Sequence, residues 1–95
     1  MDAERGTRTI LITGATDGLG RAAALFLAEN GYRVFAAGRS AEKRVQLDTL
    51  ANEKGLPLET LEMDVCDDRS AQRAVNLVYQ KAGAIDVLIN NAGLA

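Results

Sequence analysis

Two kinds of hydrophobic pattern take turns along this chain. Short apolar or alternating runs rich in β-branched residues are typical of strands buried in a parallel sheet. These runs lie at 9–13, 33–37, 58–63 and 85–89. Between them, apolar residues recur every three or four positions, which predicts helices over 20–30, 41–54 and from 67 or 68 to 82. A glycine follows each predicted helix, as expected where the chain leaves a helix in a left-handed conformation.

The order of these elements is strand, helix, strand, helix, strand, helix, strand. Such alternation predicts an α/β fold whose parallel sheet is built by right-handed crossovers, with helices on both faces. We expect a partial, Rossmann-like sheet with the strand order 3-2-1-4, formed by residues 9–95 after a polar tail at 1–8. The chain reverses direction across such a sheet between strands 1 and 4, and ligands bind outside the carboxyl ends of the strands at that point.

The loop between the first strand and the first helix has the sequence TGATDGLG, over 13–20. Its glycines, Gly14, Gly18 and Gly20, let the backbone turn sharply, approach a pyrophosphate closely and pack the helix against the strand. The N–H groups and positive dipole end of the helix then face the phosphates. Asp17 cannot bind a phosphate directly, and we interpret it as a cap of the helix start. An ordinary tight turn is the alternative for this loop taken alone.

The tip of the second strand distinguishes between two nicotinamide cofactors. An NAD site needs a carboxylate there to accept hydrogen bonds from the adenosine ribose. This chain has Arg39 and Ser40 instead. A guanidinium is a planar, permanently charged fork that matches a 2′-phosphate, and the serine adds a hydroxyl donor, so we expect NADP rather than NAD. The alternative is a solvated arginine beside a helix-capping serine. For Lys43, on the next helix, a solvated position is favoured over a phosphate contact.

Two further segments follow the third and fourth strands. Asp64 could accept a hydrogen bond from an adenine amino group with Val65 against the ring, although an aspartate in a strand-to-helix loop is common. Asn-Asn-Ala-Gly at 90–93 could tie adjacent loops through its side-chain amides and leave room for a flat group beside the backbone. A turn that merely ends the strand is the alternative for this second segment.

Composition limits the chemistry that the chain can support. It has no histidine and one cysteine, Cys66, which excludes Ser-His-Asp catalysis, histidine metal ligands and an internal disulfide. The 11 basic and 13 acidic residues are interspersed, so no basic face predicts a nucleic-acid partner. The polar start and the short apolar runs predict neither a signal peptide nor a membrane span, and we expect a cytoplasmic protein without a metal site.

The glycine loop, the tip of the second strand and the segments after the third and fourth strands together resemble the short-chain dehydrogenase/reductase family. The resemblance covers essentially the whole chain from Thr9 onward. The main branch of that family carries Thr-Gly-x-x-x-Gly-x-Gly, Asp-Val after strand 3 and Asn-Asn-Ala-Gly after strand 4, which stand here at 13–20, 64–65 and 90–93. The resemblance implies that the pyrophosphate and ribose are lined by Gly14, Thr16, Gly18, Leu19 and Gly20, with Asp17 in the same loop. It also implies a 2′-phosphate held by Arg39 and Ser40, adenine beside Asp64 and Val65, and the nicotinamide ribose along Asn91, Ala92 and Gly93.

The catalytic residues of that family have no counterpart in this chain. Its members use a serine and a Tyr-x-x-x-Lys pair, in which lysine lowers the tyrosine pKa for acid–base work. Here Ala36 follows Tyr32 and Gly83 follows Tyr79 at that spacing. The resemblance implies the NADP(H)-binding N-terminal portion of an oxidoreductase acting on an alcohol or carbonyl, truncated after strand 4 and inactive alone. A standalone NADP-binding or regulatory module and a non-catalytic scaffold fragment are the alternatives.

The fourth strand is expected to form a sheet edge. Its run Val87, Leu88 and Ile89 lacks the charges and prolines that usually protect edges. We therefore expect a homo-oligomer or other self-association through this strand.

Overall fold

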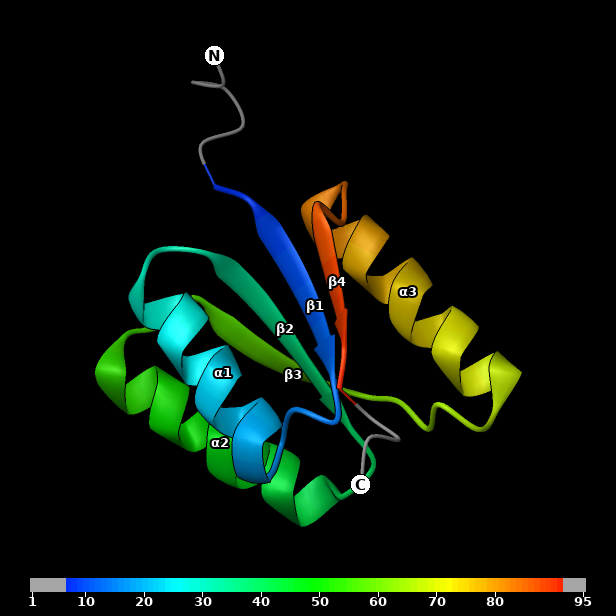
Figure 1. Cartoon of the computed structure of the whole chain (residues 1–95), viewed down its shortest axis with the longest axis horizontal. Helices are drawn as coiled ribbons and strands as arrows, with labels where there is room; N and C mark the ends of the chain where they lie inside the picture. Colours follow the sequence, from blue (N-terminus) through cyan, green and yellow to red (C-terminus); the bar gives the residue numbers. More distant parts are fainter. Residues whose placement is uncertain (1–6, 92–95) are drawn as a thin grey trace.

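Four parallel strands form one sheet in the order β3-β2-β1-β4, and helices lie on both sides of it (Figure 1). The computed structural model describes residues 7–91. The strands are β1 (Thr9–Thr13), β2 (Arg33–Gly38), β3 (Leu58–Glu62) and β4 (Val87–Asn90). The helices are α1 (Gly18–Glu29), α2 (Ala41–Lys54) and α3 (Asp68–Ala82). The predicted α/β class, strand order and parallel pairing are confirmed.

Local capping determines where the helices begin and end. α1 begins two residues earlier than predicted, because Asp17 is extended and its Oδ1 accepts a hydrogen bond from the Gly18 N–H at 2.8 Å. Ser40 caps α2 as predicted, and Gly55 ends that helix in the left-handed conformation. Asp67 caps α3, whose start the sequence leaves open between two aspartates.

β2, β3 and β4 differ at their ends from the predicted strands, and β3 ends at Glu62 rather than at 63. The sequence predicts Gly38 in a loop, but it is the last residue of β2 and pairs in register with Glu62. The Gly38 carbonyl also accepts a hydrogen bond from the Met63 N–H at 3.2 Å, which extends the pairing past the predicted end. β4 begins at Val87 rather than at 85, because its register with β1 starts at Ile10.

Alternating strand residues divide the core into two layers. α1 and α2 cover one face of the sheet and α3 covers the other (Figure 1). The first layer contains Ile12, Ala15, Ala24, Ala28, Val34, Ala36, Leu47, Ala51 and Leu58. The second contains Leu11, Phe35, Ala37, Leu61, Met63, Ala74 and Val78. This packing on both faces holds the carboxyl ends of β1, β2 and β3 side by side.

α1 packs on the sheet through small residues. Gly20, Ala24 and Ala28, spaced four apart, are its buried positions. The sequence predicts a broad apolar face that includes Ala22 and Phe26, but Ala22 is exposed and Phe26 is 63% exposed. Ala23, Leu25 and Leu27 also pack partly against the first layer. Because the fully buried positions are so small, the helix approaches the strands closely, and its first turn meets the loop after β1.

The two edges of the sheet are built differently. At the β3 edge, the Asp48 carboxylate of α2 accepts hydrogen bonds from the Thr60 N–H at 3.0 Å and from the Thr60 hydroxyl at 2.7 Å. This carboxylate occupies a main-chain donor that an added strand would need. At the β4 edge, Val87 is 40% and Leu88 is 60% exposed, and within residues 7–91 only β1 pairs with β4.

Candidate functional site

The loop that joins β1 to α1 turns through glycines in the left-handed region. Gly14 has a φ of 60° and Gly18 a φ of 54°, values that residues with a Cβ rarely adopt. Gly20 is constrained by space instead, because a Cβ there would lie 2.6 Å from Asn91 Nδ2 and would overlap the Gly14 carbonyl. The three glycines therefore set the turn and bring the start of α1 against the end of β1.

A cavity of about 360 Å³ lies where β1, β2 and β3 end, and we call it the strand-end cavity. It is lined by Gly14, Thr16, Asp17, Gly38, Arg39, Met63, Asp64, Val65 and Cys66. Six of these residues are predicted site residues, and they come from three separate stretches of the chain. The fold thus brings the glycine loop, the tip of β2 and the turn after β3 to one concave surface.

Gly38, Met63 and Cys66 line this cavity although sequence reasoning does not assign them to a site. A Cβ on Gly38 would lie 2.8 Å from Thr16 Cγ2, so only glycine lets the buried Thr16 pack against the end of β2. A glycine within an apolar strand is a recognisable signal of such a close approach. Met63 and Cys66 carry no comparable signal, because their place depends on how β3 lies beside β2.

A second cavity, of about 400 Å³, is lined by Thr16, Asp17, Arg39, Ser40 and Lys43, and we call it the basic cavity. Ser40 Oγ accepts a hydrogen bond from the Lys43 N–H at 3.2 Å, so this serine is a helix cap as well as a lining residue. Lys43 Nζ lies 2.5 Å from Asp17 Oδ2. Lys43 is exposed, as the sequence favours, and it also lines this cavity.

The Asp17 carboxylate is held in its charged form by its neighbours. The side-chain hydrogen bond from Lys43 lowers the pKa of Asp17, and the hydrogen bond from the Gly18 N–H and the charge of Lys43 lower it further. Asp17 thus caps α1 with one oxygen and pairs with α2 through the other. The capping role expected from the sequence is confirmed, whereas the pairing is a tertiary contact that the sequence does not predict.

Side-chain hydrogen bonds tie the end of β4 to the glycine loop. The Thr13 hydroxyl donates to Asn90 Oδ1 at 2.8 Å and accepts from the Asn91 N–H at 3.1 Å. Asn91 Nδ2 donates to the Gly14 carbonyl at 3.1 Å. The expected role of these amides in joining two loops is confirmed. The predicted site residues Ala92 and Gly93 lie outside the residues that the structure describes.

Asp64 and Val65 form the turn after β3. Asp64 Oδ1 accepts a hydrogen bond from the Cys66 N–H at 3.0 Å, and the Asp64 N–H donates to Ser70 Oγ at 2.9 Å. These bonds fix the rim of the strand-end cavity beside Met63. Leu19, another predicted site residue, is 80% exposed at the start of α1 and lines neither cavity.

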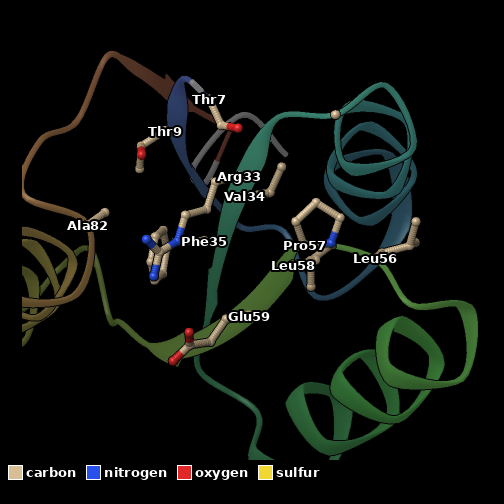
Figure 2. A pocket seen from close by; sticks show the side chains of 11 residues that line it. Thr7, Thr9, Arg33, Val34, Phe35, Leu56, Pro57, Leu58, Glu59 and Ala82 are labelled. Atoms are coloured by element: carbon tan, nitrogen blue, oxygen red, sulfur yellow. The ribbon is translucent and has the colours of Figure 1, made fainter. Parts of the chain in front are cut away.

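A larger cavity, of about 550 Å³, lies at the amino ends of the strands, away from the strand-end cavity (Figure 2). Its lining includes Thr9, Arg33, Pro57 and Glu59, and the Arg33 guanidinium carbon lies 5.2 Å from the centre of the Phe35 ring. None of the predicted site residues lines it. Because ligands of open parallel sheets bind at the carboxyl ends of the strands, the candidate site remains the strand-end and basic cavities.

The titratable side chains that line these two cavities are Asp17, Arg39, Lys43, Asp64 and Cys66. Tyr32 and Tyr79 are exposed and line neither of them. Between residues 7 and 91, no three His, Cys, Asp or Glu side chains are placed to hold a metal ion. Over the same span, every helix is too short or too polar to traverse a bilayer.

Comparison with known proteins places this arrangement among oxidoreductases. The family model for short chain dehydrogenases matches residues 8–95. An uncharacterized oxidoreductase of Myxococcus xanthus is 40% identical over 92 residues, which cover 97% of this chain and 36% of that protein. The NADPH-dependent pterin aldehyde reductase of Arabidopsis thaliana is 40% identical over 86 residues, which cover 90% of this chain and 35% of the reductase.

A solved structure has the same fold. A variant of actinorhodin polyketide ketoreductase, crystallised with NADPH, superposes with a TM-score of 0.88 at 32% sequence identity. The match covers 94% of this chain and 34% of the ketoreductase. The chain thus spans about a third of the length of the proteins that it matches.

Proposed function

Because the chain belongs to the short chain dehydrogenase family, whose members bind a nicotinamide dinucleotide, we propose that its strand-end and basic cavities hold the adenosine side of NADP(H). The observation that carries this proposal is the position of Arg39, which lines both cavities at the tip of β2. An NAD site has a carboxylate at that tip. The NADPH-dependent reductase and the ketoreductase crystallised with NADPH support the same choice.

The shape of the glycine loop fits a pyrophosphate. Gly14 and Gly18 add no side chain to the turn, and at Leu19 and Gly20 the first turn of α1 presents main-chain N–H groups with the positive end of the helix dipole. The strand-end cavity, at about 360 Å³, is within the size range of small-molecule sites. In the proposed complex, Thr16 lies beside the phosphates, where it already lines both cavities.

The other parts of the nucleotide would contact the other loops at the carboxyl ends of the strands. Adenine would lie beside Asp64 and Val65, whose turn is fixed by hydrogen bonds between main-chain N–H groups and the side chains of Ser70 and Asp64. A 2′-phosphate would enter the basic cavity and meet Arg39 and Ser40. Asn91, held against the glycine loop, would begin the nicotinamide side, together with Ala92 and Gly93.

The chemistry of the proposed cofactor is hydride transfer to a carbonyl or from an alcohol. The residues of this chain bind and orient the nucleotide, since no Tyr-x-x-x-Lys pair occurs in its sequence. We propose that the 95-residue chain binds NADP(H) without turnover, as the cofactor-binding portion of a longer oxidoreductase. Dehydrogenase activity of the purified chain above that of a Gly18 and Gly20 double variant would refute this part of the proposal.

The single cysteine provides a direct test of ligand binding. Cys66 is exposed and lines the strand-end cavity, so a bound adenosine group would shield its thiol from reagents. We expect NADP at ten times its Kd to slow modification of Cys66 by about tenfold, because only the free chain reacts. The rate is measured with a chromogenic disulfide. Nicotinamide mononucleotide, which lacks adenosine, serves as the control ligand and should give no protection. Equal rates with saturating NADP and with buffer would contradict the proposed site.

We also propose that β4 pairs with β4 of a second copy. β4 exposes Val87 and Leu88, whereas at the β3 edge the Asp48 carboxylate occupies the Thr60 N–H. We expect sedimentation velocity to show dimers at micromolar concentration, and Leu88→Lys to yield monomers because a charged side chain on an edge strand opposes pairing. Leu77→Lys, on α3, is the control for an added charge. A monomeric parent chain at those concentrations would contradict this prediction.

A further inference from the structure

Asp17 and Lys43 form an ion pair between two elements of the proposed phosphate site. Asp17 belongs to the glycine loop and Lys43 to the first turn of α2, and their charged atoms lie 2.5 Å apart. Both side chains are substantially exposed, at 71% for Asp17 and 46% for Lys43. A ligand that enters from solvent can therefore reach either partner.

The ion pair stands between two cavities. The basic cavity lies on the side of Arg39 and Ser40. A neighbouring cavity of about 370 Å³ is lined by Thr16, Asp17, Gly18, Arg21, Ala22, Lys43 and Gln46. Thr16, Asp17 and Lys43 line both, so the pair bridges the walls where the two spaces adjoin.

Positive charges outnumber negative charges around this ion pair. Three cationic side chains, Arg21, Arg39 and Lys43, line the two cavities, with Asp17 as the one carboxylate among their described lining residues. A phosphate in the basic cavity would be attracted by Lys43 and repelled by Asp17. The ammonium that such a phosphate would use is already bonded to the carboxylate.

We propose that Asp17 is a built-in competitor of the 2′-phosphate for Lys43, so that this ion pair limits how strongly the chain prefers a phosphorylated ribose. This inference rests on the proposed NADP function and adds two specificity-determining residues to it. On binding, Lys43 exchanges the carboxylate for the phosphate, and the affinity gained from the phosphate is reduced by the bond that is lost. A nucleotide without a 2′-phosphate leaves the pair closed.

Calorimetric titration of the 95-residue chain with adenosine 2′,5′-bisphosphate and with 5′-AMP tests this inference. Asp17→Asn removes the charge but keeps an oxygen that accepts from the Gly18 N–H, so the cap of α1 is retained. We expect the variant to bind the bisphosphate about three- to tenfold more tightly than the parent chain. The gain for 5′-AMP should be smaller, because that nucleotide has no 2′-phosphate to compete with Asp17 for Lys43.

A double-mutant cycle separates competition from simple repulsion. Lys43→Gln should weaken bisphosphate binding, and the gain from Asp17→Asn should be smaller in the Lys43→Gln background than in the parent, because no bond to Lys43 is then lost. Glu42→Gln is the matched control, since Glu42 precedes Lys43 in α2 but lines neither cavity. It should change bisphosphate affinity by less than Asp17→Asn does. Melting temperatures of all variants verify that they fold.

The possible results distinguish this inference from the proposed function. If the parent chain binds bisphosphate more tightly than 5′-AMP and Asp17→Asn brings no gain, the competition is refuted while the NADP function stands. Equal gains in both backgrounds also refute it and leave only repulsion by Asp17. If neither the parent chain nor any variant binds either nucleotide, the proposed function and the inference both fail.

Discussion

Arg39→Asp is expected to reverse the nucleotide preference of this chain. The substitution removes the guanidinium that lines both cavities and places a carboxylate at the tip of β2, where it can accept hydrogen bonds from ribose hydroxyls. Loss of a charge-assisted contact, together with new repulsion of the 2′-phosphate, should change the ratio of the NADP and NAD dissociation constants by about a hundredfold or more. Calorimetric titration with both nucleotides measures that ratio.

The matched control for this experiment is Arg73→Asp. Arg73 is exposed on α3 and lines neither cavity, so the control changes the net charge equally without touching the site. Its nucleotide ratio should equal that of the parent chain. Should Arg39→Asp leave both dissociation constants unaltered, the basic cavity would not be a phosphate site, and a scaffold role would be favoured.

Gly20→Ala is expected to damage both folding and nucleotide binding. The new Cβ would overlap the Gly14 carbonyl and lie 2.6 Å from Asn91 Nδ2, so either α1 or the end of β4 has to move. Overpacking of this kind should lower the free energy of unfolding by about 2–3 kcal/mol. The displaced glycine loop should then lose measurable NADP binding. Urea denaturation and calorimetry report the two effects.

Two control variants distinguish the effect of steric overlap at Gly20 from the effect of backbone strain. Gly18 and Gly55 have φ values of 54° and 66°, and a Cβ on either would meet nothing within 4 Å. Gly18→Ala and Gly55→Ala should therefore cost similar stability, about 1–2 kcal/mol each, through left-handed strain alone. Only Gly18→Ala should weaken NADP binding, because Gly55 ends α2 far from the loop in sequence and lines neither cavity. A Gly20→Ala chain as stable as the parent would contradict the predicted close contact.

Local sequence signals account for most of the fold. Strand-like runs, helix caps and left-handed glycines act over a few residues, so Ser40, Gly55 and Gly83 take the positions predicted for them. The alternation of strand and helix then limits the topology to a parallel sheet, whose carboxyl edge collects the loops that carry the predicted site residues. The grouping of Thr16, Arg39 and Asp64 follows from topology alone.

Contacts between elements could not be predicted in the same way. Hydrophobicity favours Phe26 for the buried side of α1, but close approach to the sheet selects Gly20, Ala24 and Ala28. The distance between Asp17 and Lys43 depends on how the first turns of two helices lie, which no pattern within either helix specifies. The sequence predicts Gly38 in a loop because glycine is rare within strands, but here glycine ends β2 because Thr16 needs the space.

If β4 pairs with β4 as proposed, the Asp48 carboxylate that accepts from the Thr60 N–H would limit how large the assembly can become. A sheet whose two edge strands can both pair with another copy can grow into a fibre. A sheet with only one free edge strand cannot. In a dimer paired through β4, the two outer edges of the joined sheet would be the β3 strands, where Asp48 occupies the Thr60 N–H. Growth would stop at a closed pair, so concentrating the protein should raise the fraction of dimer without producing filaments.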